Sequence, residues 1–257
     1  MSQVFFWRRR LEKRRREQQI RELEALENPD VFETRLAQMD RIHSLRRIYV
    51  MGCGRSGTWL LTALMTTFED VEVLPKEVPV ELFGLTPSAK STLVLKRNYK
   101  AYRHVENISD RIELLHIVRH PFDVLTSYNP MSSRKYHISP DRWLGEMLAL
   151  RYLIESARKH FLVIRYEDLV DDPPKVQLDL AGRLHLSIKS DATKIDETFV
   201  ASDRATNAMH GLRKIDRNSV GQYRADATKL EYLRSISRRV EPMLPWVAQH
   251  FGYDVAL

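Results

Sequence analysis

A glycine-rich loop follows the first apolar run of the sequence, and its composition suits phosphate binding. The apolar residues 48–51 lead into Gly52, five loop residues follow up to Gly57, and a helical pattern begins at Thr58. In a strand–loop–helix arrangement the backbone N–H groups of the loop and the positive end of the helix dipole point at one spot. The sequence therefore predicts that a nucleotide or another phosphorylated donor binds here.

This loop differs from the Walker A loop of kinases and ATPases, which reads Gly-x-x-x-x-Gly-Lys-[Ser/Thr]. Gly52 and Gly57 have the required separation, but Thr58 stands where the lysine belongs, and the cation of the loop is Arg55. No apolar run ends in an aspartate that would obviously hold Mg²⁺. The run that comes nearest to this pattern is followed by Arg119 instead. Cys and His residues lack zinc-ligand spacing as well. We therefore expect an anion site without a metal.

The bulk composition is that of a globular α/β protein. The 257 residues are 43% hydrophobic and 29% charged, which fits one α/β domain with an appendage. No apolar run approaches the ~18 residues that span a bilayer, and the arginines of residues 8–16 interrupt any secretory signal. Cys53 is the one cysteine, so an intramolecular disulfide is impossible. We expect a cytoplasmic protein.

Most of the net charge lies at the N-terminus. Of the net charge of +7, six units come from residues 1–16, which hold seven basic residues and one acidic residue. The basic pI is therefore poor support for a specific nucleic-acid partner. Residues 1–40 favour a helical basic arm, and residues 41–257 the catalytic domain. The aromatic residues 5–7 could contact an anionic membrane peripherally, although a solvated or partner-bound helix is the plainer interpretation.

The remaining pattern alternates strands with helices. Several strands are continuous apolar runs, which is typical of parallel strands covered on both faces. The sequence thus predicts an α/β fold with a P-loop-like central parallel sheet and helices on both faces. The expected strands are 46–51, 71–74, 91–95, 111–118 and 161–165, and the expected helices are 58–68, 123–128, 141–159, 175–184 and 230–251, the last broken at Pro242 and Pro245.

Ligands of such sheets bind at the carboxyl ends of the strands, where polar side chains of this sequence gather. Glu77 and Glu81 follow the second expected strand, Lys96 and Arg97 the third, and Arg119 the fourth. We expect the cations among them to meet Arg55 at one edge of the sheet.

Two separated segments resemble the sulfotransferases that use 3′-phosphoadenosine 5′-phosphosulfate (PAPS). Residues 52–61 are similar to the family's 5′-phosphosulfate loop, in which Lys or Arg precedes Ser-Gly-Thr. Residues 118–128 are similar to its 3′-phosphate motif, in which Ser127 follows Arg119 by eight positions. Weaker similarities lie at residues 166–169, 217–224 and 249–253. The resemblance thus extends over residues 46–253 and favours the carbohydrate-type, bacterial-like branch.

The resemblance implies that PAPS binds as donor co-substrate, without a metal. Its two anionic ends need two sites, and arginine with serine gives a charge-assisted pair for the 3′-phosphate. If a helix begins near residue 122, Asp123 and Ser127 share one of its faces. The donor-binding residues implied in this way are Gly52, Gly54, Arg55, Ser56, Gly57, Thr58, Trp59, Arg119, Ser127, Arg217, Gly221, Tyr223 and Arg224.

The resemblance also implies sulfuryl transfer to a hydroxyl or amine. Arg55 would stabilise the departing bridging oxygen, with Lys96 as a second cation. Members acting on phenols and steroids carry a histidine two residues after that lysine, where this sequence has Asn98. Carbohydrate-type members use a glutamate after the second strand instead, a place that Glu77 fits, with Glu81 as second choice. The acceptor expected is therefore a glycan or glycolipid.

Other interpretations stay open. His104 and His116 could line the cleft, although an isolated histidine is more often structural. A P-loop kinase of a small metabolite would share the fold, and a non-catalytic nucleotide-binding adaptor could be tethered by the basic arm. The sequence identifies neither the acceptor nor the oligomeric state.

Overall fold

The structure of the protein is a computed structural model, and a five-stranded parallel sheet forms its centre. The strand order is β2-β3-β1-β4-β5, and all four strand pairs are parallel. The strands are β1 (Arg46–Gly52), β2 (Val71–Val78), β3 (Thr92–Arg97), β4 (Ile112–Val118) and β5 (Phe161–Arg165). The structure describes residues 30, 33–34, 37, 45–78, 86, 88–97, 101–128, 134–199, 215 and 217–257.

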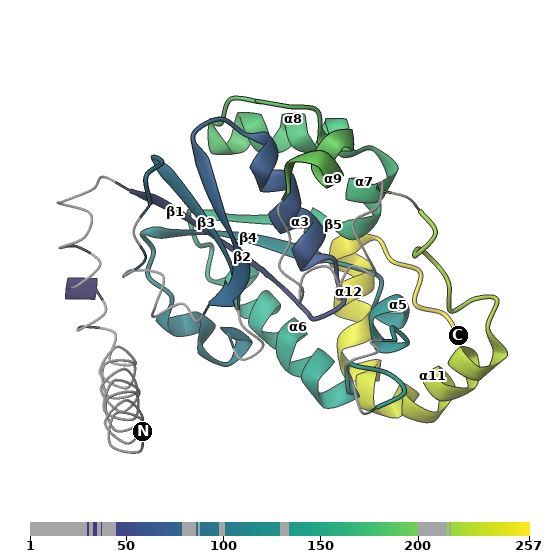
Figure 1. Cartoon of the computed structure of the whole chain (residues 1–257). Helices are drawn as coiled ribbons and strands as arrows, with labels where there is room; N and C mark the ends of the chain where they lie inside the picture. The colour runs from purple at the N-terminus through teal and green to yellow at the C-terminus, as the bar shows by residue number, and fades with distance from the viewer. Residues whose placement is uncertain are drawn as a thin grey trace, which may run out of the picture.

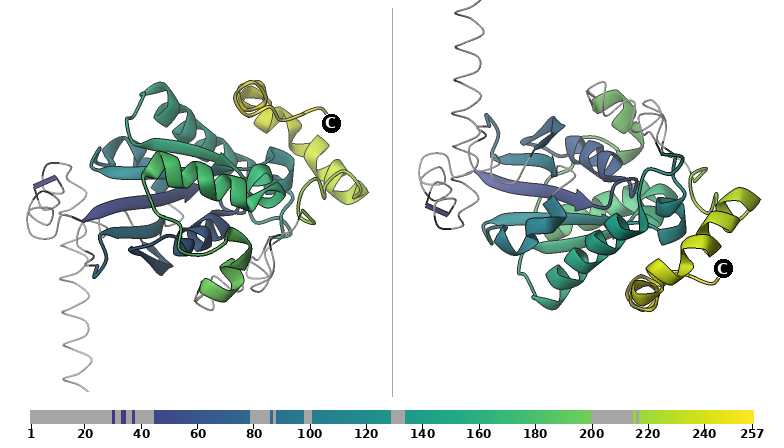
Figure 2. Two further views of the ribbon diagram at one scale, coloured as in Figure 1. Left: turned by 90° about the horizontal axis from the view of Figure 1, so that it is seen from above. Right: turned by 90° about the horizontal axis from the view of Figure 1, so that it is seen from below.

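Helices cover both faces of this sheet (Figures 1 and 2). The α-helices of the described residues are α3 (Thr58–Leu64), α5 (Pro121–Leu125), α6 (Pro140–Glu155), α7 (Tyr166–Asp171), α8 (Pro173–Leu184), α9 (Ile195–Thr198), α11 (Ala227–Val240) and α12 (Leu244–Phe251). The 3-10 helices are η1 (Met65–Thr67), η2 (Ala101–Asn107), η3 (Ala192–Lys194) and η4 (Glu241–Met243). The predicted doubly wound α/β architecture is confirmed.

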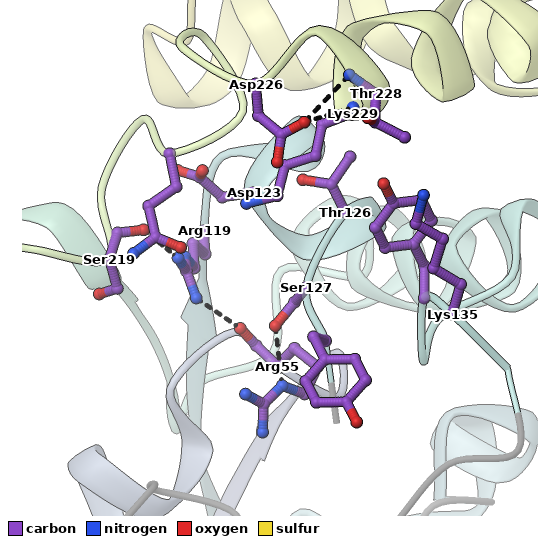
Figure 3. Close-up of a pocket in the computed structure, with 13 residues that line it drawn as sticks. Arg55, Arg119, Asp123, Thr126, Ser127, Lys135, Ser219, Asp226, Thr228 and Lys229 are labelled. Atoms are coloured by element: carbon purple, nitrogen blue, oxygen red, sulfur yellow. Dashed lines mark hydrogen bonds between the residues drawn. The ribbon is translucent and has the colours of Figure 1, made fainter. Parts of the chain in front are cut away.

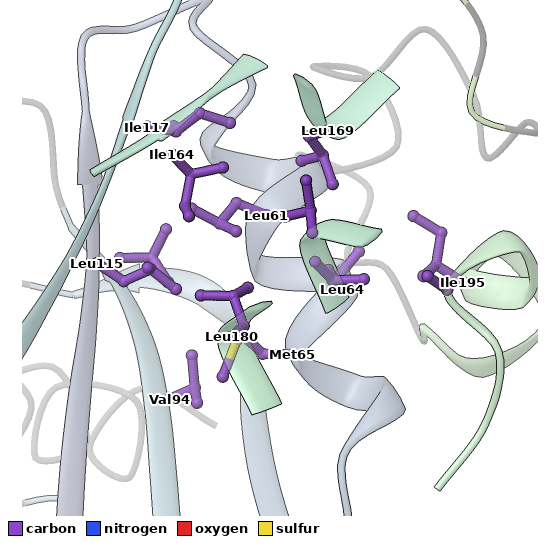
Figure 4. Packing of buried hydrophobic residues seen from close by; sticks show 14 of the residues in the cluster. Leu61, Leu64, Met65, Val94, Leu115, Ile117, Ile164, Leu169, Leu180 and Ile195 are labelled. Carbon is purple, nitrogen blue, oxygen red and sulfur yellow. The ribbon is translucent and has the colours of Figure 1, made fainter. Parts of the chain in front are cut away.

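Strand β1 shows why both faces must be covered. Ile48 and Val50 pack into the cluster formed with α3, α7, α8 and α9, whereas Tyr49 and Met51 pack into the cluster formed with η2 and α6. All four side chains are buried, because successive residues of a strand point to opposite faces of the sheet. Figure 4 shows the first of these clusters.

Strands β2 and β3 run further than the sequence predicts. Strand β2 continues through Pro75 to Val78, with a register shift between Val73 and Glu77. It is an edge strand, where a proline without N–H is tolerated at an irregularity. Glu77 therefore lies within β2 rather than after it, and Lys96 likewise lies within β3.

Helix boundaries also differ from the expected ones. Helix α5 begins at Pro121 and ends at Leu125, so Ser127 lies outside it, and the expectation that Asp123 and Ser127 share a helix face is wrong. The Thr126 hydroxyl donates to the carbonyl oxygen of Phe122 at this helix end. Helix α3 ends at residue 64, α6 ends at 155, and α7 was not predicted. The break predicted in the last helix is confirmed by η4.

Some predictions fall outside the described residues. The basic arm up to residue 29, Glu81, Asn98 and the side chain of His104 are among them. Within the described ranges, no helix combines the length and the apolar character that crossing a membrane requires.

Candidate functional site

The glycine loop between β1 and α3 has a tightly constrained backbone. Gly52 and Gly57 have φ angles of +143° and +97°, which L side chains rarely adopt. A Cβ atom at Gly52 would lie 2.5 Å from the carbonyl oxygen of Ile117 in the adjacent strand β4. The hydroxyl of Ser56 closes the turn by donating to the carbonyl oxygen of Cys53 at 2.7 Å. The loop conformation therefore depends on glycine at both ends.

The ring of Tyr166 packs against this loop at Gly57. It begins α7 directly after β5, and a Cβ atom at Gly57 would come within 2.4 Å of its ring. The Arg119 guanidinium carbon lies 4.5 Å from the centroid of the same ring, within cation–π range. Residue 166 directly follows the strand expected over 161–165, but no local sequence signal indicates this packing. Its ring fixes the distance between the loop and Arg119.

Arg55, Arg119 and Ser127 meet at one place, as Figure 3 shows. The Nε of Arg55 donates to the Oγ of Ser127 at 2.9 Å, and Nη1 of Arg119 donates to the carbonyl oxygen of Arg55 at 3.0 Å. Arg55 itself has φ +71°, in the left-handed region that is unusual for a non-glycine residue. The two motifs found in the sequence thus form one site.

The electrostatics of this site favour an anion. Burial, followed by repulsion from Arg119, lowers the pKa of Arg55 from 12.5 to about 10. An anionic ligand between the two guanidinium groups would relieve this repulsion. The Nε of Arg119 is buried and makes no hydrogen bond within the described part of the chain. These observations fit a phosphate or sulfate group.

A late segment of the chain covers Arg119. Its Nη2 donates to the carbonyl oxygen of Ser219, and the Ser219 hydroxyl lies 2.5 Å from that of Tyr166. The backbone N–H of Gly221 donates to Oδ2 of Asp123 at 2.7 Å. Residues 219–221 therefore pack against Arg119 and against the neighbouring helices α5 and α7.

The other donor-binding residues expected in this segment make structural contacts. Arg217 forms an exposed ion pair with Asp171 at 2.6 Å. Tyr223 is buried and stacks on His120, with ring centroids 5.1 Å apart, and Arg224 donates to the Tyr223 hydroxyl at 3.1 Å. The contribution of this segment to the pocket described next comes instead from Ser219 and Gln222.

A pocket of about 550 Å³ opens beside Arg55 and Arg119 (Figure 3). Its lining residues include four cations and two carboxylates. They are Arg55, Arg119, Asp123, Thr126, Ser127, Tyr128, Lys135, Tyr136, Ser219, Gln222, Asp226, Thr228 and Lys229. Lys135 and the α11 residues are not among the predicted donor-binding residues, because they adjoin Arg55 and Ser127 only in the folded chain.

A second polar group adjoins the loop on the β2–β3 side. Glu77 and Lys96 are register partners in these strands, and Oε1 of Glu77 lies 2.5 Å from Nζ of Lys96. The Lys96 ammonium also lies 4.5 Å from the Trp59 ring centroid in α3. The fold therefore brings together three residues that the sequence singled out separately.

Two other candidates have structural roles. Arg97 is buried and pairs with the buried Glu146 at 2.7 Å, so the expectation that it joins the cations at the ligand edge is wrong. Burial, and then repulsion from Arg97, lowers the pKa of His116 from 6.5 to about 3. His116 is thus a buried neutral histidine rather than a cleft residue. Within the described ranges no three His, Cys, Asp or Glu side chains are grouped to hold a metal ion.

Comparison with known proteins gives one kind of match. No protein-family model and no curated protein sequence matches the chain. Among solved structures, the sulfotransferase domain of the Synechococcus PCC 7002 olefin synthase aligns with a TM-score of 0.56 at 17% identity, covering 82% of this chain and 95% of that domain. The sulfotransferase domain of the curacin biosynthetic pathway aligns with a TM-score of 0.53 at 14% identity, covering 75% of this chain and 98% of that domain.

A third similar structure contains a nucleotide. Mouse sulfotransferase SULT7A1, complexed with PAP, aligns with a TM-score of 0.51 at 14% identity, covering 80% of this chain and 88% of that chain. All three matches extend over most of both chains, and all three are sulfotransferases. The chain therefore has the sulfotransferase fold.

Proposed function

We propose that this protein transfers a sulfuryl group from PAPS to a hydroxyl or amine of an acceptor, which we infer to be a glycan or glycolipid. One observation carries the proposal: Arg119 and Ser127, from the second motif, both contact Arg55 of the glycine loop. A donor with anionic groups at two positions needs such a junction of cations and hydroxyls. The sulfotransferase fold and the PAP complex of one similar structure add support.

The glycine loop and Arg55 would hold the 5′-phosphosulfate, and Arg119 with Ser127 the 3′-phosphate. Attack of the acceptor oxygen on sulfur forms one S–O bond while the bond from sulfur to the phosphate oxygen breaks, and the adenosine bisphosphate leaves. Arg55 would stabilise the charge that develops on that phosphate oxygen. Lys96 supplies a second cation on the β3 side.

Deprotonation of the acceptor needs an acid–base group beside the sulfuryl. We infer that Glu77 takes part in this acid–base chemistry, because it is held by Lys96 next to Trp59 of α3. Asn98 stands where phenol- and steroid-specific relatives would carry histidine. This departure is why a glycan or glycolipid is the proposed acceptor class.

Calorimetry with adenosine 3′,5′-bisphosphate, followed by labelled-sulfate transfer from PAPS over a panel of glycans and glycolipids, tests this proposal. We expect the bisphosphate to bind and Arg55→Gln to abolish transfer. Arg151→Gln is the matched control, since Arg151 is exposed on α6 and forms its ion pair with Glu155 one turn further along the same helix. Absence of bisphosphate binding, together with phosphoryl transfer from ATP, would overturn the proposal in favour of a kinase.

A further inference from the structure

The segment that precedes α6 packs against the glycine loop. The backbone N–H of His137 donates to the carbonyl oxygen of Ser127 at 3.2 Å, the residue whose hydroxyl holds Arg55. A Cβ atom at Gly54 would lie 2.9 Å from the side chain of Ile138. His137 is therefore fixed between the loop and the second motif, although neither motif contains it.

The imidazole of His137 has an unused nitrogen. Its Nδ1 is buried and has no hydrogen-bond partner among the described residues. The ring is only partly buried. A buried polar atom of this kind normally has a partner. A neutral imidazole nitrogen can accept a proton or a hydrogen bond. Because Nδ1 is buried whereas Nε2 is not buried in this way, Nε2 is the nitrogen that an acceptor hydroxyl could reach.

Charged groups from four parts of the fold act on this imidazole. Burial lowers its pKa below 6.5, and so do the guanidinium groups of Arg142 in α6, Arg55 in the loop and Arg134 in its own segment. Glu77 in β2 acts in the opposite direction. His137 is thus neutral at pH 7 and lies within electrostatic reach of both Arg55 and Glu77.

We propose that His137 is a further catalytic residue of this site, which takes the proton from the acceptor hydroxyl. The inference rests on the proposed sulfuryl transfer and names its proton acceptor. The acceptor O–H bond breaks, its proton moves to the imidazole, the oxygen bonds to sulfur, and the adenosine bisphosphate leaves with the electron pair of the broken S–O bond. The imidazolium then releases the proton to water.

Glu77 acts through His137 in this scheme. Protonating Glu77 would remove the charge that holds Lys96 at 2.5 Å, whereas protonating His137 creates a cation that Glu77 stabilises. The donor would add negative charge beside Arg55, which offsets guanidinium repulsion and makes the imidazole a stronger base in the complex. Glu77 is then a positioning and electrostatic partner, and His137 the group that touches the substrate.

The test uses the full chain with PAPS as donor and glycerol as the hydroxyl probe, and follows labelled sulfate leaving PAPS for glycerol or water. We expect His137→Gln to slow this release at least 100-fold, as general-base catalysis contributes ~10²–10⁴-fold, with bisphosphate affinity unchanged. His160→Gln, at an exposed histidine, is the matched control and should behave as wild type. Unaltered release in His137→Gln overturns the inference.

A titration separates His137 from Glu77. Nitrogen-15 NMR of the histidines, with adenosine 3′,5′-bisphosphate bound, should show the His137 midpoint moving to lower pH in Glu77→Gln and to higher pH in Arg134→Gln. These opposite shifts follow from the signs of the two charges. A midpoint that neither variant moves overturns the role of His137. Failure of the wild type to bind the bisphosphate would instead overturn the proposed function itself.

Discussion

The Nε of Arg55 donates a hydrogen bond of 2.9 Å to the Oγ of Ser127, across 72 positions of the sequence. Neither residue lies in regular secondary structure: Arg55 belongs to the loop after β1, and Ser127 follows the end of α5. The contact joins the two stretches whose sequences resemble donor-binding motifs. It is the structural basis for treating them as a single anion site.

Arg119→Ala should weaken binding of adenosine 3′,5′-bisphosphate far more than binding of adenosine 5′-phosphate. Loss of a charge-assisted hydrogen bond costs about 1.5–3 kcal/mol, which corresponds to roughly a 10- to 100-fold loss of affinity. Calorimetry with both ligands measures the difference. Arg151→Ala, on the exposed face of α6, serves as control. An equal loss for both ligands would contradict the assignment of Arg119 to the 3′-phosphate.

Gly57→Ala should destabilise the protein by about 1–3 kcal/mol, because residues in sparsely populated backbone conformations cost this much. At φ +97° its Cβ would also strike the Tyr166 ring. Gly182→Ala in α8 is the matched control, since nothing lies within 4 Å of its added Cβ, and it should stabilise by ~0.5–1 kcal/mol. Denaturant unfolding of both variants provides the comparison. Equal effects would refute the steric argument.

Stability should fall as the pH drops below 6.5, with His116 as one cause. Its pKa is about 3 in the folded protein, against 6.5 ordinarily. Between these values the unfolded chain binds a proton that the folded chain does not, so the group costs about 1.4 kcal/mol per pH unit. Above pH 6.5 it has no such effect. Urea unfolding at pH 7, 6 and 5 measures how the free energy of unfolding falls with pH, and this fall should be less steep in His116→Leu than in the wild type. An equally steep fall would exclude His116 as a cause.

Binding of the bisphosphate should not depend on Mg²⁺. The cations expected to neutralise it belong to side chains, above all Arg55 and Arg119, and Thr58 replaces the lysine of a Walker loop. Calorimetry in EDTA and in Mg²⁺ should therefore give the same affinity within experimental error. A strict requirement for Mg²⁺ would favour the kinase interpretation.

Much of the fold follows from local sequence signals. The apolar runs that became β1, β4 and β5 are continuous, and a proline-marked break separates α11 from α12. Strand β2 was underestimated because Pro75 looks like a strand terminator, whereas an edge position accommodates it. Helix α7 was missed because its six residues are too few for a periodic pattern.

The site was harder to predict where it depends on contacts between side chains that are distant in the sequence. Residues of the glycine loop, Arg119 and Ser127 are visible as motifs with fixed spacing. The ion pair of Arg97 with Glu146, 49 positions away, carries no local signal, so Arg97 looked like a ligand-edge cation. The same holds for Lys229, which reaches the pocket through the placement of α11 against α6.

Three side chains from different parts of the fold hold residues 219–221: Arg119 after β4, Asp123 in α5 and Tyr166 in α7. The segment from 217 to 225 consists of turns and bends, so its shape depends on these anchors. Their contributions to stability are therefore thermodynamically coupled. Changes at Asp123 and Tyr166 together will not sum as independent effects would, and a substitution at Asp123 will alter the surroundings of Arg119 through residues 219–221.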